Sequence, residues 1–259
     1  MFGLNNIPQV TKNLLLLNIL MFVLTFVFQQ QGVDLGTLLG AHYVNSPLFR
    51  PYQIVSYFFM HADVFHIFFN MFALVMFGGF LERLWGPKRY FILYVSAAIG
   101  AFALYNAIGV YEIMECRKAL PAELVSAVDG IMSSGSSRIG ILNSINEYLN
   151  LHPGLDFEMS TLSTYFEKTT TPMVGASGSI FGIMAAFAIL FPNTELQLMF
   201  IPVPIKAKFL IGGYFVYEVY SSIYQSQGDN VAHLAHVGGA VVGAALVLLW
   251  RRKDKTNFY

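Results

Sequence analysis

The 259-residue chain has the composition of a membrane protein, since 56% of its residues are hydrophobic and only 12% are charged. An ordinary soluble domain carries about 25% charged residues, so a soluble globular class is excluded. The formal net charge is +0, which gives nucleic acid no basic surface to bind. Cys116 is the only cysteine, which excludes an internal disulfide and a cysteine-based metal site. We therefore predict an integral membrane protein whose partner is the lipid bilayer, with no nucleic acid, no metal and no other cofactor.

Six apolar stretches each approach the roughly 20 residues that a helix needs to cross a bilayer. The first is predicted to be retained rather than cleaved as a signal peptide, because Lys12 is the only positive charge before it and no small-x-small site follows it. The prediction is an all-α integral membrane protein, with six transmembrane helices in a single domain over residues 1–259. In chain order the stretches are Asn13–Gln31, Val64–Leu84, Tyr90–Val110, Met173–Phe191, Ile205–Tyr224 and Ala232–Trp250.

Lysine and arginine orient these helices. With the N-terminus in the cytoplasm, ten of the 15 Lys and Arg residues lie inside and five outside. Four of the outer five fall in one long loop, and long loops count less in the positive-inside rule. Both termini are therefore predicted to be cytoplasmic. The short core without an appended soluble domain favours a bacterial plasma membrane.

The long outer loop, Tyr111–Thr171, separates the third and fourth stretches. Helix-like apolar spacing recurs in Val125–Met132, Ile139–Leu149 and Met159–Phe166. We expect an outward-facing insertion with short helices on the membrane surface. Two roles stay open for it: shaping the access of a substrate, or a passive insertion.

Three of the predicted helices bring polar residues to one leaflet. The second, fourth and sixth all run from outside to inside, and their outer ends carry His66 and Asn70, Ser177, and His236 respectively. Ser177 lies about four residues into its stretch, or roughly 6 Å at 1.5 Å per residue. Because polar side chains are costly inside a bilayer and usually mark function there, these residues are predicted to meet at a shallow depth.

Small residues allow the helices to approach. Two small-x-x-x-small pairs are present, Gly178 with Gly182 and Gly239 with Gly243. His236 shares one helix face with the second pair, at i, i+3 and i+7, and that face would bring its imidazole against Ser177. Helix packing by glycine without any chemistry is the alternative, and the matched depth of serine and histidine favours catalysis.

The chemistry predicted for this pair is nucleophilic catalysis. Ser177 would attack as nucleophile and His236 would act as general base. No acidic residue is placed by the sequence to orient the histidine, so a dyad is predicted. The free N–H groups at the start of the fourth helix point at the developing oxyanion. His66 and Asn70, at i and i+4, would donate to the same oxygen, or would form only an interhelical polar clamp.

At these residues the chain resembles the rhomboid intramembrane serine proteases. The resemblance covers all six stretches, and Tyr52-Gln53 stands where the family often carries Trp-Arg. The residues that carry it are His61, the His66–Asn70 block, Gly78-Gly79, Glu82, Gly86, the Gly175–Gly178 element and the Ala235–Gly239 element.

The resemblance implies a role for each matching position. It implies that Ser177 and His236 form the dyad, and that the oxyanion is surrounded by His66, Asn70 and the backbone amides of Ser177 and Ala176. It also implies that Phe181 stacks on the catalytic histidine. The supporting residues are His61, Phe181, Gly175, Gly178, Gly239 and Gly243.

Other polar residues have less defined expectations. His233 is expected to face water near the entrance, and His61 to join a hydrogen-bond network around the cavity. Glu218, inside the fifth stretch, is a functional candidate by position, yet a neutral or tyrosine-bonded carboxyl near the outer interface is preferred. His42 and His152 are expected to be ordinary surface residues.

These observations predict a serine endopeptidase that cleaves transmembrane segments of other membrane proteins near the outer face of the bilayer. The resemblance implies a preference for spans that unwind easily and carry a small residue before the scissile bond. Attack needs extended backbone, and helix-breaking residues lower the cost of unwinding. The alternatives are a transporter, which would show inverted repeats or broken helices in both halves, and a rhomboid-like pseudoprotease that binds spans without cutting them. The sequence does not specify the oligomeric state.

Overall fold

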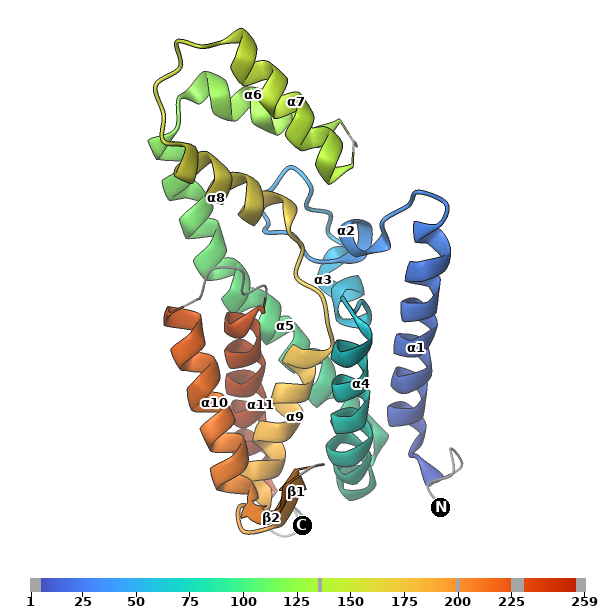
Figure 1. Ribbon diagram of the computed structural model, residues 1–259. Helices are drawn as coiled ribbons and strands as arrows, with labels where there is room; N and C mark the ends of the chain where they lie inside the picture. The colour runs from blue at the N-terminus through green and yellow to red at the C-terminus, as the bar shows by residue number, and fades with distance from the viewer. Residues whose placement is uncertain (1–5, 135–136, 199–200, 225–230, 255–259) are drawn as a thin grey trace.

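The computed structural model describes residues 6–134, 137–198, 201–224 and 231–254. A helical bundle carries a lobe of three further helices at one end (Figure 1). Gly135 and Ser136 of the predicted outer loop, and Lys255 of the inner positive charges, lie outside the described residues.

The bundle helices are α1 (Gln9–Gln29), α4 (Val64–Ala73), α5 (Gly79–Ala119), α9 (Ser177–Leu190), α10 (Ala207–Ile223) and α11 (His233–Lys253). The lobe holds α6 (Ala122–Ser133), α7 (Arg138–Leu151) and α8 (Met159–Thr170), while α2 (Leu35–Leu39), α3 (Gln53–Ser56) and a 3₁₀ turn (Tyr57–Phe59) precede α4.

Within the described residues, three helical runs are long and apolar enough to cross a membrane: Gln9–Gln29, Val64–Ala119 and His233–Lys253. The second comprises α4, a π-helical turn over Leu74–Gly78, and α5. Gly86 breaks this run with φ 78° and ψ 168°, a conformation that glycine adopts without steric cost. The chain reverses there, so that α4 and most of α5 run in opposite directions (Figure 1).

Glu82 fixes the start of α1 against α5. The backbone N–H of Val10 donates to Glu82 Oε1 at 2.8 Å, and the N–H and hydroxyl of Thr11 both donate to Oε2 at 2.7 Å. The first N–H groups of a helix have no partner within the helix, and an anion there also suits the helix dipole. The Glu82 carboxylate therefore stabilises the contact between α1 and α5 at the end of the bundle opposite the lobe.

Helix α9 is held between α5 and α11 by small residues. A Cβ at Gly239 would overlap the carbonyl oxygen of Gly178, and one at Gly243 would overlap that of Gly182. On the other side, a Cβ at Gly182 would overlap the side chain of Ala97 on α5. The predicted glycine pairs therefore do face each other, and the backbones of α9 and α11 touch directly.

The fifth predicted stretch, Ile205–Tyr224, starts too early. A hairpin of β1 (Glu195–Leu198) and β2 (Ile201–Lys206) joins α9 to α10, with Glu195 opposite Lys206, and α10 begins only at Ala207. Pro202 and Pro204 favour extended backbone, since proline removes a helical N–H donor.

The predicted helices of the outer loop are confirmed as α6, α7 and α8. They enclose a hydrophobic cluster of their own, separate from that of the bundle, in which the buried side chains include Leu124, Val128, Met132, Ile141, Ile145 and Leu162. The amphipathic spacing of each helix supplies this cluster.

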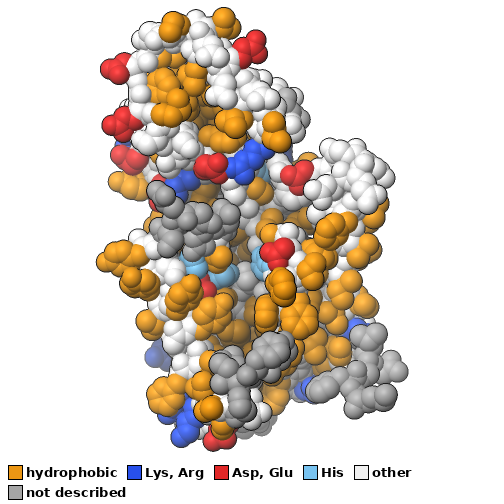
Figure 2. Space-filling model, viewed as in Figure 1, with side chains coloured by type: hydrophobic (Ala, Val, Ile, Leu, Met, Phe, Trp, Pro, Cys, Tyr) orange, Lys and Arg blue, Asp and Glu red, His pale blue; other side chains and the backbone are white. Residues whose placement is uncertain are grey.

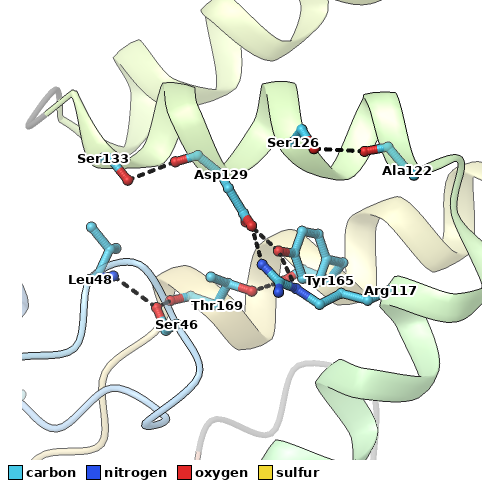
Figure 3. Close-up of polar contacts among 9 residues, drawn as sticks. All are labelled: Ser46, Leu48, Arg117, Ala122, Ser126, Asp129, Ser133, Tyr165 and Thr169. Atoms are coloured by element: carbon cyan, nitrogen blue, oxygen red, sulfur yellow. Dashed lines mark hydrogen bonds and ion pairs between the residues drawn. The ribbon is translucent and has the colours of Figure 1, made fainter.

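Polar contacts tie the lobe to the bundle (Figure 3). Arg117, near the end of α5, forms an ion pair with Asp129 of α6 and donates from Nε to the Tyr165 hydroxyl at 3.1 Å. The Tyr165 hydroxyl in turn donates to Asp129. The Ser46 hydroxyl donates to the Thr169 carbonyl at 2.9 Å and so joins α8 to the segment before α4. Helices α6 and α8 are thus held to α5 and to the segment before α4.

Gln53 anchors that segment in place of the arginine that the family often carries. Its Oε1 accepts from the N–H groups of His42 and Arg50 at 3.3 and 3.1 Å, and its Nε2 donates to the carbonyls of Leu38 and Leu48 at 3.2 and 3.3 Å.

The expectation that His42 is a surface residue is wrong: its side chain is buried, and burial lowers the pKa of His42. His152 is exposed, as expected.

Replacing Glu82 with alanine removes the acceptor of three hydrogen bonds in a site where the side chain is 4% exposed. We expect Glu82→Ala to lower the free energy of unfolding by about 3 kcal/mol, because buried donors lose their partner. Thermal unfolding in detergent micelles measures this, with the exposed Glu147→Ala on α7 as control. Equal unfolding temperatures for both variants would contradict the anchoring role.

Candidate active site

The chain reaches Ser177 in extended conformation. Met173 and Ala41 exchange backbone hydrogen bonds of 2.8 Å, and the Gly175 N–H donates to the Tyr57 carbonyl at 3.0 Å. The fourth predicted stretch therefore becomes helical only at Ser177, not at Met173. Gly175 has φ +123°, which L side chains rarely adopt. Ser177 is thus the first residue of α9, at the mouth of the bundle rather than one turn inside a helix.

The structure brings Ser177 and His236 together. His236 Nε2 lies 2.8 Å from Ser177 Oγ, although the two residues are 59 positions apart in the chain. The ring of Phe181 stacks on the His236 imidazole, with centroids 4.4 Å apart and planes at 10°. Phe181 therefore lies where the resemblance to the rhomboid family placed an aromatic ring, and it restricts the plane of the imidazole.

A carboxylate stands behind His236, and the prediction that no acidic residue is placed there is wrong. Glu218 Oε2 lies 2.8 Å from His236 Nδ1 and 2.6 Å from His233 Nδ1. Glu218 is 1% exposed and His233 is also buried, so the expectation that His233 faces water is wrong too. Glu218 points from α10 toward both imidazoles of α11, and the Tyr214 hydroxyl also lies beside its carboxylate, as the expectation of a tyrosine partner has it.

The depth of Glu218 was available from the sequence. Helix α10 ends at Ile223, five residues or about 7.5 Å beyond Glu218. His236 lies three residues, or about 4.5 Å, inside the start of α11. Counting from the outer end of the fifth stretch would have placed the carboxylate near the level of the histidine.

His66 and Asn70 of α4 line the same cavity as Ser177. The carboxylate of Asp63 caps α4 by accepting the His66 N–H at 2.9 Å. A Cβ built on Gly175 would stand 2.7 Å from His66 Nε2 and 3.5 Å from Ser177 Oγ, so both atoms border the same small space. Asn70 is 7% exposed, and among the described residues its Nδ2 has no hydrogen-bond partner.

Backbone donors add to these side chains. Ala176 precedes the first turn of α9 without a side-chain cap, so the first N–H groups of α9 have no partner in the helix. The positive end of the helix dipole lies at the same point. The N-terminus of α9 therefore opens into the cavity that His66 and Asn70 also line.

His61 contributes a ring contact and no network. Its imidazole meets that of His66 edge-to-face, with centroids 5.0 Å apart. Neither ring nitrogen of His61 has a hydrogen-bond partner in the described part of the chain, so the predicted network around it is not present there. Burial lowers the pKa of His61 to about 3, which keeps the ring neutral beside His66.

A cavity of about 1260 Å³ opens at these residues, and its lining includes His66, Asn70, Ser177, Phe181 and His236. Part of its wall comes from α8, through Ser163, Thr164, Glu167 and Lys168. Figure 2 shows histidine side chains at the surface, in the hollow beneath the lobe. The site is therefore open to water and to an incoming chain segment although it lies within the apolar bundle.

The three groups behind Ser177 also have the chemistry of metal ligands. One ligand atom from each of Glu218, His233 and His236 lies within 4.8 Å of the others, and imidazole nitrogen with carboxylate oxygen suits Zn²⁺. In this structure both Nδ1 atoms stand at hydrogen-bond distance from a single carboxylate oxygen. Hydrogen bonding accounts for the arrangement of the cluster without an ion.

Comparison with known proteins identifies relatives of this chain. The Rhomboid domain family model matches residues 49–114 and 131–253. RHOMBOID-like protein 12, mitochondrial, of Arabidopsis thaliana is 26% identical over 251 residues, covering 96% of this chain and 60% of that protein. Rhomboid protein 1, mitochondrial, of Saccharomyces cerevisiae is 24% identical over 211 residues, covering 80% of this chain and 42% of that protein. The chain thus spans only about half the length of these relatives.

Gly239→Ala tests whether the contact of α9 with α11 sets the geometry of the site. The added methyl overlaps the Gly178 carbonyl, so the helices must separate and Ser177 must lose its hydrogen bond to His236. We expect the rate at which a fluorophosphonate labels Ser177 to fall about 100-fold, the order of loss that a 1 Å misplacement causes.

Gly213→Ala on α10 is the matched control, because a Cβ there meets nothing within 4 Å. It should label at the wild-type rate. Wild-type labelling of a folded Gly239→Ala protein would show that the helix contact does not determine the Ser177–His236 distance.

Proposed function

The chain belongs to the rhomboid family, and from this premise we propose that it is an intramembrane serine endopeptidase. Its substrates would be transmembrane segments of other membrane proteins. The observation that carries the proposal is the 2.8 Å approach of His236 Nε2 to Ser177 Oγ at the wall of an open cavity. Serine and histidine in this geometry are the minimal parts of a nucleophile and its general base.

We propose that the bundle crosses the membrane six times. The run Val64–Ala119 would cross twice, once on each side of Gly86, and α9 and α10 would complete the set with α1 and α11. The start of α1 is bound by Glu82, and the rings of Trp85 and Trp250 lie 5.7 Å apart. These contacts support placing both termini on one side, with Ser177 toward the other.

The length of α9 supports a site below the membrane surface. Its 14 residues span about 21 Å, which is shorter than the roughly 30 Å hydrocarbon core of a bilayer. The extended segment before Ser177 would make up the difference, with its backbone groups bonded to Ala41 and Tyr57. Non-helical backbone at membrane depth is tolerated where protein surrounds it or water reaches it.

The first step would be acylation of Ser177. His236 Nε2 takes the Ser177 Oγ proton while Oγ bonds to the carbonyl carbon of the scissile peptide. The carbonyl oxygen becomes an oxyanion, which the α9 N-terminus, Asn70 and His66 are arranged to stabilise. The C–N bond then breaks, and the imidazolium gives its proton to the leaving amine.

Deacylation would follow the same steps of proton transfer and attack, with water as the nucleophile. His236 takes a proton from a water molecule, whose oxygen bonds to the acyl carbon and forms a second oxyanion. The ester bond to Ser177 breaks, and its oxygen recovers the proton from His236. The new carboxyl end leaves, and both residues return to their starting states.

The cavity supports a role for the lobe in substrate access. Helix α8 lines the same cavity as Ser177 and His236, and Ser46 and Arg117 hold the lobe to the bundle. An incoming segment would pass this wall before its backbone is extended at Ser177. We therefore prefer the access role over a passive insertion.

We propose that the protein resides in a membrane and do not assign that membrane to an organelle or cell type. The relatives in Arabidopsis thaliana and Saccharomyces cerevisiae are both named as mitochondrial, so they lend no support to the bacterial plasma membrane that the sequence analysis favoured. The lipid bilayer and transmembrane protein substrates stay as the proposed partners.

Ser177→Ala and His236→Ala should abolish cleavage of a model single-span substrate in proteoliposomes, because each removes half of the proposed dyad. The exposed Ser126→Ala and His152→Ala serve as matched controls with wild-type rates. Fluorophosphonate labelling confined to Ser177 would separate a protease from a transporter or a pseudoprotease. Full cleavage by a folded Ser177→Ala protein would refute the proposal.

Asn70→Ala should retain the fold and lose cleavage rate. Its Nδ2 is a buried donor without a partner in the described residues, so removing that donor breaks no hydrogen bond among them. We expect kcat to fall on the order of 100-fold, as for the loss of one oxyanion donor. An unchanged kcat would show that the side chain belongs to an interhelical clamp instead.

A further inference from the structure

Glu218 gives this site a third member, and the inference below rests on the proposed function. We propose that Glu218 is a positioning residue that orients His236 toward Ser177, so that the dyad works as a Ser177–His236–Glu218 relay. The relay runs across three helices, from α9 to α11 to α10. It is carried by two contacts of 2.8 Å, one on each nitrogen of the His236 ring.

The two contacts determine which nitrogen of His236 must carry the proton. To accept the Ser177 proton, Nε2 needs a free lone pair, so a neutral imidazole must hold its own proton on Nδ1. An ionised carboxylate only accepts hydrogen bonds, and Glu218 Oε2 lies 2.8 Å from Nδ1. The carboxylate therefore favours the one tautomer of His236 that can act as base.

His233 holds the carboxylate in place. Its Nδ1 lies 2.6 Å from the same oxygen of Glu218, and its ring is buried. An intramembrane carboxylate is costly unless donors compensate it, and here the Nδ1 atoms of two imidazoles lie at hydrogen-bond distance from one oxygen. His233 thus fixes Glu218 at the position from which it orients His236.

The proposed reaction creates a positive charge on His236, next to the Glu218 carboxylate. When His236 accepts the Ser177 proton, an imidazolium forms 2.8 Å from the Glu218 carboxylate. Opposite charges at this distance attract strongly in a site of low polarity, and Glu218 is 1% exposed. Phe181 stacks on the face of the ring, so His236 is held along its edge and across its plane.

Glu218→Gln tests the relay with a side chain of the same size. The glutamine NH₂ group donates to Nδ1, which favours the tautomer with the proton on Nε2, and that tautomer cannot accept from Ser177. We expect kcat for a model single-span substrate to fall about 100-fold or more, with KM changed less than about 3-fold because substrate binding is untouched. Glu218→Asp should recover part of the lost rate.

Nitrogen-15 NMR of histidine-labelled protein reads the tautomer directly. We expect the Nδ1–H form of His236 in the wild type and the Nε2–H form in Glu218→Gln. Glu82→Gln is the matched control, since Glu82 is also a buried carboxylate, and among the described residues its hydrogen bonds go to α1. It should lower the unfolding temperature and leave kcat and the His236 tautomer unchanged.

The outcomes separate the two proposals. A wild type that cuts and a Ser177→Ala protein that does not, together with wild-type kcat and tautomer in Glu218→Gln, would overturn the relay and leave the protease. Cleavage that survives Ser177→Ala would overturn both. Loss of wild-type activity in EDTA, restored by Zn²⁺, would show that Glu218, His233 and His236 bind a metal, and would also overturn the relay.

Discussion

A hydroxyl and an imidazole exchange a proton only at hydrogen-bond distance, and in this bundle the backbone contact between α9 and α11 sets that distance. Gly239 and Gly243 meet the carbonyls of Gly178 and Gly182 with no room for a methyl group. Ser177 and His236 sit one turn or less from this contact, at the ends of the same two helices. The hydrogen bond between them is therefore a consequence of helix packing rather than of loop conformation, which suits a site that needs rigid placement.

Polar groups within an apolar bundle need hydrogen-bond partners, and in this site some of the groups have partners while one donor lacks one. Ser177, His236, His233 and Glu218 satisfy one another. Asn70 leaves its Nδ2 without a partner in the described residues, which is a cost in the resting state. In the proposed reaction such a donor gains its partner when a negative oxygen forms beside it, which would recover the cost.

Sequence reasoning reached the parts of the site that follow from one-dimensional patterns. The glycine spacing on α9 and α11 and the shallow depth of Ser177 and His236 are regular along the helices, so counting locates them. The start of α9 at Ser177 was not predictable by counting, because it depends on pairing between Met173 and Ala41, which are distant in the chain. Glu218 was recognised as a candidate but not linked to His236, because α10 runs the opposite way and its relevant end is its C-terminus.

Two buried carboxylates illustrate why the same physical requirement leads to different roles. Glu82 is compensated by the N–H groups of Val10 and Thr11 and by a hydroxyl, none of which gains or loses a proton in neutral water, so its charge only holds α1. Glu218 is compensated by two imidazoles, and the protonation of one of them changes during the proposed reaction. The attraction felt by Glu218 is therefore strongest when His236 is charged. A carboxylate whose best partner exists only during the reaction stabilises the transition state more than the resting enzyme.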